Sequence, residues 1–229
     1  MPNSKQTTPP AGCKTDFQKF VSRLENMILT GAFKLRERLV EATLAEMFGV
    51  SRYWVRDAFK ILETKELVTI TPFKGVVVSE LSEQKVEEIF VIRVAMEQLA
   101  ARLSLEKATA EEIKTLRMLV EKIKEAGREK NIVAMIEADS HFHDHLFQLS
   151  GNLTLHRMIN DLRNRSQIIR YAAWSSPDVL SRIFEEHEWI VDAIESRDMN
   201  GLNKLVERHI GHAKEVYLFR LKAETALLA

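Results

Sequence analysis

The long segment that follows Leu81 shows none of the alternation of apolar and polar residues that marks β-strands. Glycine, a poor helix former, occurs in it at few positions, namely Gly127, Gly151, Gly201 and Gly211. Such a segment buries its apolar side chains by packing helices together, so we expect about five to seven helices. The expected breaks lie near positions 108–109, 127–131, 150–152, 175–178 and 196–200.

The first third of the chain has a different pattern. Apolar residues recur at helical spacing over 17–28, 44–48 and 51–64, and Ser51 is a good N-cap for the third helix. Two β-branched runs then flank Pro72–Gly75 and predict a small hairpin. Three helices followed by a hairpin make a winged helix-turn-helix. We therefore expect a mainly α protein, with a β-hairpin wing near its N-terminus and an all-α helical bundle after it.

The composition excludes several classes of protein. The chain is 45% hydrophobic and 29% charged, and no apolar run approaches the roughly 18 residues of a membrane helix. A single cysteine, Cys13, cannot form an internal disulfide, and the polar N-terminus lacks the apolar core of a signal peptide. We expect a cytoplasmic protein with no membrane partner.

Charge divides the chain unevenly. Residues 1–79 contain 12 Lys and Arg against 8 Asp and Glu, or +4, while the remainder has 21 against 25, or −4. This split suggests that the first segment meets a polyanion. We expect a flexible tail over 1–14, a DNA-binding domain over 15–79, and an all-helical domain for effector, metal and dimerisation over 80–229.

The residue types of the third helix and the hairpin suit contact with DNA. Arg52 and Arg56 lie one turn apart at the start of that helix, where their guanidinium groups can bond a guanine at two points or clamp phosphate. Tyr53 lies beside them, and Lys74 and Gly75 lie at the hairpin tip, where a wing touches backbone or minor groove. The alternative is that the two arginines form a solvated helix face.

A second group of polar residues suits a metal ion. Asp139 and His143 are four positions apart, so they share one helix face and can bind one ion together. His187 and His209 lie in two further helical segments, and a bundle can direct such side chains at one interior point. Three imidazoles and a carboxylate suit Zn, Ni, Mn, Co or Fe(II). The alternative is that each histidine is an ordinary core or surface residue.

One set of residues points to a known DNA-binding module: Arg38-Leu39, Glu41, Leu44-Ala45-Glu46, Gly49-Val50-Ser51-Arg52, Val55-Arg56, Leu62-Glu63, Leu67-Val68 and Gly75. With them, residues 31–81 resemble the winged helix-turn-helix of the GntR family of bacterial transcription regulators. The resemblance implies DNA contacts by Arg52, Arg56 and Gly75. Three pairs depart from the family's usual residues: Leu35-Arg36 for Pro-Gly, Tyr53-Trp54 for Thr-Pro, and Lys65-Glu66 for an acidic or polar residue followed by Gly.

A second set spans 88–217: Ile89-Phe90-Val91-Ile92-Arg93, Glu97, Ala100-Ala101-Arg102-Leu103, Asp139-Ser140-His141-Phe142-His143, Ser150-Gly151-Asn152, Glu186-His187 and Arg208-His209-Ile210. With them, the chain is similar to the FCD domain, the all-helical ligand-binding module of the FadR subfamily. This resemblance implies a divalent metal bound by four ligands, Asp139, His143, His187 and His209. It leaves the other histidines without a role: His141, His145, His156 and His212.

A metal held in this way can also bind a small organic acid, whose carboxylate completes the coordination while nearby cations hold its other end. Arg93 and Arg163 are candidate effector-binding residues, and Arg170 is a further one, although Glu97 is an equally good partner for Arg93. Because one recognition helix covers few base pairs, we expect a homodimer on a palindromic operator. Repression relieved by the effector is the commoner arrangement in this family.

The alternative function is a metal-dependent hydrolase. The run His141–His145 suggests the H-x-H-x-D-H loop of metallo-β-lactamase-type enzymes, but it is one residue short and lies within a helical period. An enzyme also needs a general base or nucleophile near the metal, and the sequence marks none. We therefore expect a regulator of transcription and not an enzyme.

Overall fold

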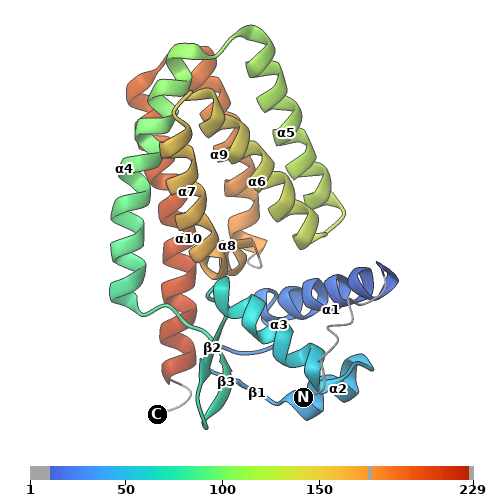
Figure 1. The fold of residues 1–229 in the computed structure, drawn as a ribbon. Helices are drawn as coiled ribbons and strands as arrows, with labels where there is room; N and C mark the ends of the chain where they lie inside the picture. Colours follow the sequence, from blue (N-terminus) through green and yellow to red (C-terminus); the bar gives the residue numbers. More distant parts are fainter. Residues whose placement is uncertain (1–10, 175–176, 227–229) are drawn as a thin grey trace. The chain divides into compact units, whose positions relative to one another are not determined.

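The computed structural model describes residues 11–174 and 177–226, and the chain divides into two compact units, Met1–Ser79 and Glu80–Ala229. The expected class, a winged helix-turn-helix followed by a helical bundle, is confirmed (Figure 1). Within the described residues, no helix has the length and apolar character needed to cross a membrane.

The first unit holds three helices and a small antiparallel sheet of strand order β1-β3-β2. The Oγ of Ser51 accepts a hydrogen bond from the Trp54 N–H at 3.2 Å, which caps α3 as the sequence predicts. Leu24, Phe59 and Leu62 are fully buried and form part of its core. The elements are α1 (Ala11–Leu29), β1 (Arg38–Leu39), α2 (Glu41–Phe48), α3 (Arg52–Thr64), β2 (Val68–Thr71) and β3 (Gly75–Val78).

Two details of this unit differ from the prediction. The tail expected over 1–14 is helical from Ala11 onward, because each residue that extends an existing helix adds a hydrogen bond. Residues 1–10 lie outside the described part of the chain. The hairpin gains a third strand, in which Arg38 pairs with Val77 and Leu39 pairs with Val76. A two-residue strand is too short to leave a periodic signal in the sequence.

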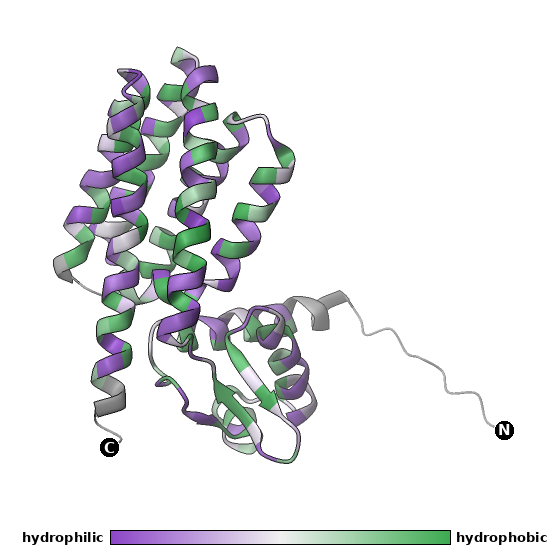
Figure 2. Ribbon diagram, turned by 90° about the vertical axis from the view of Figure 1, so that its left-hand side faces the viewer, coloured by the Kyte–Doolittle hydropathy of each residue, from purple (hydrophilic) through white to green (hydrophobic). Residues whose placement is uncertain are grey.

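The second unit is a bundle of seven helices among the described residues. Most of its helices carry both hydrophilic and hydrophobic residues within each turn (Figure 2), and α10 packs on α4, α8 and α9. The sequence analysis did not predict the break between α7 and α8 at Ser166. One expected break, at 175–178, includes residues 175–176, which lie outside the described part of the chain. The helices are α4 (Glu83–Lys107), α5 (Ala110–Arg128), α6 (Ile132–Leu149), α7 (Leu153–Arg165), α8 (Gln167–Trp174), α9 (Pro177–Glu195) and α10 (Met199–Ala226).

Candidate metal centre and nucleic-acid interface

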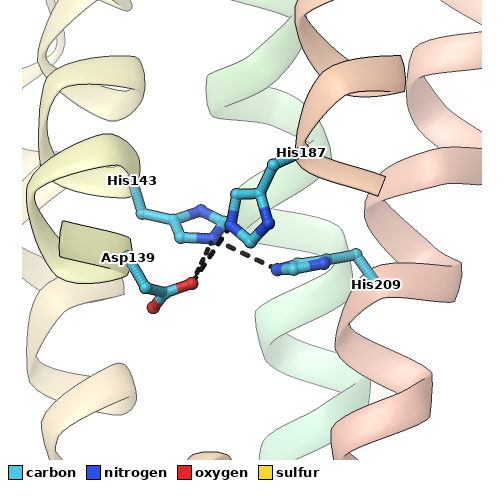
Figure 3. A group of neighbouring side chains, drawn as sticks. All are labelled: Asp139, His143, His187 and His209. Carbon is cyan, nitrogen blue, oxygen red and sulfur yellow. Dashed lines mark hydrogen bonds and ion pairs between the residues drawn. The ribbon is translucent and has the colours of Figure 1, made fainter. Parts of the chain in front are cut away.

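The four side chains predicted as metal ligands meet inside the helical unit (Figure 3). Asp139 and His143 come from α6, His187 from α9 and His209 from α10. Each offers one ligand atom, and these atoms lie within 4.8 Å of one another. Asp139, His143 and His187 are buried and His209 is nearly so. The structure thus brings together residues that are up to 70 positions apart.

The distances within this cluster fit a single ion. The Nε2 of His143 lies 3.2 Å from the Nε2 of His209 and 3.3 Å from the Oδ1 of Asp139. The Nε2 of His187 lies 3.1 Å from the same Oδ1. Two ligands that bind one ion at about 2.0–2.1 Å lie roughly 2.9–3.4 Å apart in octahedral or tetrahedral geometry. These three separations fall in that range, and all four ligand atoms lie within 4.8 Å of one another.

Hydrogen bonds on the far side of two rings decide which atoms face the cluster. The Nδ1 of His187 lies 2.7 Å from the carbonyl oxygen of Ile183, and the Nδ1 of His209 lies 3.2 Å from a carboxylate oxygen of Glu186. Both oxygens can only accept, so each Nδ1 carries the hydrogen and each Nε2 presents a lone pair. At the cluster, the lone pair of His187 faces the carboxylate of Asp139, and that of His209 faces the Nε2 of His143. Such a convergence of acceptors suits a cation, and the donor set fits a divalent transition metal.

The charge states suit a metal as well. Burial lowers the pKa of His143 far below its usual value, and burial also lowers the pKa of His209. Burial acts to raise the pKa of Asp139, but His143 and the other neighbouring donors outweigh it and hold that pKa well below the usual range. At neutral pH these two rings are therefore neutral and the carboxyl group is ionised, which are the forms that bind metals.

Three buried arginines adjoin the cluster. The second oxygen of Asp139, Oδ2, accepts hydrogen bonds from Arg163 at 3.0 Å and from Arg170 at 3.3 Å. Arg93 donates to Glu97 at 2.8 Å, so the intrahelical partner considered in the sequence analysis is present. Burial lowers the pKa of Arg170 to about 10, which leaves it charged at neutral pH.

A small cavity lies between these arginines and the metal cluster. It encloses about 20 Å³, which is room for roughly one water molecule. Both predicted effector residues, Arg93 and Arg163, line it. Its other lining residues are Asp139, Arg170, Ala173, Trp174, Ile183, His209, Ile210 and Ala213. Any ligand larger than water requires these side chains to move apart.

The remaining histidines have their own partners or lie at the surface. His145 lies 2.8 Å from a carboxylate oxygen of Glu112, and His156 lies 2.6 Å from one of Asp144. His212 contacts Glu186 and His141 is exposed. The metal cluster includes none of these four rings.

On α3, the predicted DNA-binding residues Arg52, Tyr53 and Arg56 are all exposed. The Nε of Arg56 lies 2.7 Å from a carboxylate oxygen of Glu41 on α2, a contact that the sequence did not reveal. Trp54, which with Tyr53 replaces the family's usual Thr-Pro, packs edge-on against Phe17, with ring centroids 5.5 Å apart. Trp54 thus packs on the first helix, while the three predicted residues remain exposed.

At the hairpin tip, Lys74 is exposed and Gly75 has a φ of 98°, a conformation that favours glycine. A Cβ at Gly75 would lie 3.4 Å from the guanidinium of Arg38 on β1. Phe73 precedes them and is fully exposed. Sequence reasoning assigned no contact to Phe73, although an aromatic residue at a turn is an unusual placement that could have marked it.

Comparisons with known proteins agree with this geometry. The sequence model of the FCD domain matches residues 88–212, and that of bacterial regulatory proteins of the gntR family matches residues 18–78. The chain is 30% identical over 202 residues to the uncharacterized HTH-type transcriptional regulator YdhC of Bacillus subtilis, covering 86% of this chain and 88% of that one. It is 30% identical over 184 residues to the Nta operon transcriptional regulator of Aminobacter aminovorans, covering 80% and 86%.

Among solved structures, McbR/YncC of E. coli has the same fold. It aligns with a TM-score of 0.68 at 22% identity, covering 90% of this chain and 98% of that one.

Proposed function

The chain belongs to the GntR family of bacterial transcription regulators and carries an FCD domain, and from this premise we propose that it is a metal-containing repressor whose DNA binding responds to a small carboxylate. The relatives are regulators and not enzymes, so the hydrolase alternative has no support. The proposal further places the protein in the cytoplasm, where operator DNA lies.

The observation that carries the proposal is the double role of Asp139. Its Oδ1 faces the histidine cluster, and its Oδ2 accepts hydrogen bonds from Arg163 and Arg170. One carboxylate thus joins the candidate metal site to the candidate effector site. A divalent metal bound by the three histidines and Asp139 would supply an electrophilic anchor for the carboxylate of a ligand.

The charge around the cavity favours an anionic effector. Three guanidinium groups face two carboxylates there, so one positive charge is unmatched within this group: Arg93, Arg163, Arg170, Glu97 and Asp139. Buried charges require partners. A small organic acid would supply one and bond the arginine forks at two points. Its carboxylate would also compete with Asp139 for Arg163 and Arg170.

Support for a homodimer comes from exposed apolar side chains on α4 and α7, two helices that pack together. We define the dimer face by five such residues, Val91, Ile92, Leu99, Leu153 and Met158. A face of this kind suits an isologous interface, in which the same patch of both copies meets. Two copies would place two α3 helices and two wings on the half-sites of a palindromic operator.

The test uses the full chain and a fluorescent fragment of its own promoter region. We expect DNA binding to weaken as the salt concentration rises. In a screen of small carboxylic acids, we expect those that bind to raise the Tm of the protein only when Zn²⁺ is present. A carboxylic acid that raises the Tm should also release the DNA. Expression from a reporter under the same promoter should rise when the gene for this protein is deleted. Carboxylates that act equally well after metal chelation would contradict the shared site, and a falling reporter would make the protein an activator.

A further inference from the structure

Glu186 is a buried carboxylate to which the sequence analysis assigned no role beyond the family resemblance. It lies directly before the candidate ligand His187 on α9, and it is only 1% exposed. Its side chain faces α10, where it contacts Arg208 at 3.2 Å, His209 at 3.2 Å and His212 at 2.8 Å. Two hydrogen bonds, from Arg208 and His209, and the close contact with His212 tie this buried charge on α9 to α10 beside the cluster.

Of these contacts, the one to His209 has a chemical consequence. The carboxylate accepts from Nδ1 of that ring, so Nδ1 keeps the hydrogen and Nε2 keeps its lone pair toward the cluster. The other two rings are oriented differently. His187 donates to a backbone carbonyl, while the Nδ1 of His143 has no hydrogen-bond partner among the described residues.

We propose that Glu186 is a positioning residue, which holds His209 in the tautomer and orientation needed to bind a divalent cation. The proposal rests on the proposed metal site. His209, on α10, is the ligand that most needs such support, because it is the least buried of the four. Carboxylate partners of metal-binding histidines typically change the metal affinity about 10- to 100-fold.

The first experiment uses the metal-free full chain with ¹⁵N-labelled histidine. Long-range ¹H–¹⁵N NMR should show the hydrogen of His209 on Nδ1 in the wild type and a mixture of both tautomers in Glu186→Ala. This measurement needs no metal, so it tests Glu186 even where the metal proposal fails. A wild-type His209 protonated on Nε2 would overturn the inference.

The second experiment measures Zn²⁺ affinity by competition with a chromophoric chelator. We expect Glu186→Ala to weaken binding about 10- to 100-fold, and Glu186→Gln to recover part of it because its amide oxygen still accepts from Nδ1. The matched control is His212→Ala, which removes another partner of the same carboxylate and should stay within about twofold of the wild type. Equal losses in His212→Ala and Glu186→Ala would show that the effect does not come from the contact with His209 and would refute the positioning role.

Discussion

Arg36 and Glu66, in the winged unit, adopt left-handed backbone conformations, with φ of 65° and 57°. Glycine is usual at both positions in the family this chain resembles, and the structure gives the reason, since a side chain with a Cβ is strained there. This chain has the left-handed conformation at both positions but has arginine and glutamate there in place of glycine. With Phe73, whose φ is 64°, the winged unit contains three non-glycine residues in this strained conformation.

Replacing Glu66 with glycine should raise the free energy of unfolding by about 1 kcal/mol, because the left-handed conformation costs glycine little. Urea unfolding of the full chain measures the change. Glu66→Ala is the control, since it removes the carboxylate and keeps the Cβ. A gain of the same size in Glu66→Ala would assign the effect to the carboxylate and not to the backbone.

The buried rings of His143 and His209 make the metal-free protein sensitive to acid. Their pKa values are lowered in the folded state by burial, so the unfolded chain binds protons that the folded chain does not. Stability should therefore fall as the pH drops below about 6.5, by up to roughly 1.4 kcal/mol per pH unit for each ring. Urea unfolding between pH 7.5 and 5.5 with a chelator checks this. A double His143→Gln, His209→Gln variant should lose that part of the slope, and an unchanged slope would contradict the assignment.

At the scale of elements, α3 combines two faces. Val55, Phe59 and Leu62 are buried against the unit's core, while Arg52 and Arg56 are exposed. The contact of Arg56 with Glu41 is a surface ion pair, which contributes at most about 1 kcal/mol to stability. It holds the guanidinium against the first residue of α2, and DNA would have to compete with Glu41 for it.

Arg56→Ala should weaken operator binding about 5- to 150-fold, the equivalent of roughly 1–3 kcal/mol for a base contact, with little change in Tm. Fluorescence anisotropy and a thermal scan measure the two effects. Lys60→Ala, one turn further along the exposed side of α3, is the control and should retain most of the affinity. A matching fall in Tm would favour a packing role for Arg56.

The dimer face gives a second prediction at this scale. Ile92→Glu places a charge on α4 at the proposed interface and should convert the dimer to monomers at micromolar concentration, as sedimentation velocity would detect. Met118→Glu on α5 is the matched control, because Met118 is similarly exposed but lies outside the dimer face. If both variants stay dimeric, the face defined here is not the interface.

At the scale of the whole molecule, the candidate DNA-binding residues and the candidate metal ligands lie in two different compact units. The winged unit presents cations at its surface, and the helical unit buries three arginines that line one cavity. Regulation then requires that ligand binding in one unit changes the affinity of the other, a coupling that is reciprocal by thermodynamics. Operator DNA should accordingly change the affinity for the carboxylate by the same factor, which isothermal titration can compare directly.

Much of this protein follows from local patterns. The spacing of apolar residues encodes the helices. The residues that form the cap at Ser51, and those that form the pair Asp139–His143, lie within about one helical turn of each other in the chain. Short features without periodicity were missed, including strand β1 and the break at Ser166. Strand β1 depends on pairing with β3, which is distant in the chain, and the break depends on the single residue Ser166.

What the sequence by itself determined is the set of helices, their apolar faces and the residue types of the two sites. Only the tertiary structure decided that Trp54 turns inward to Phe17, that Glu41 contacts Arg56, and that Glu186 faces His209. Periodicity acts over a few residues, so it encodes which face of a helix is buried. Which side chains meet across that buried space depends on how the helices pack, and no local pattern carries that information.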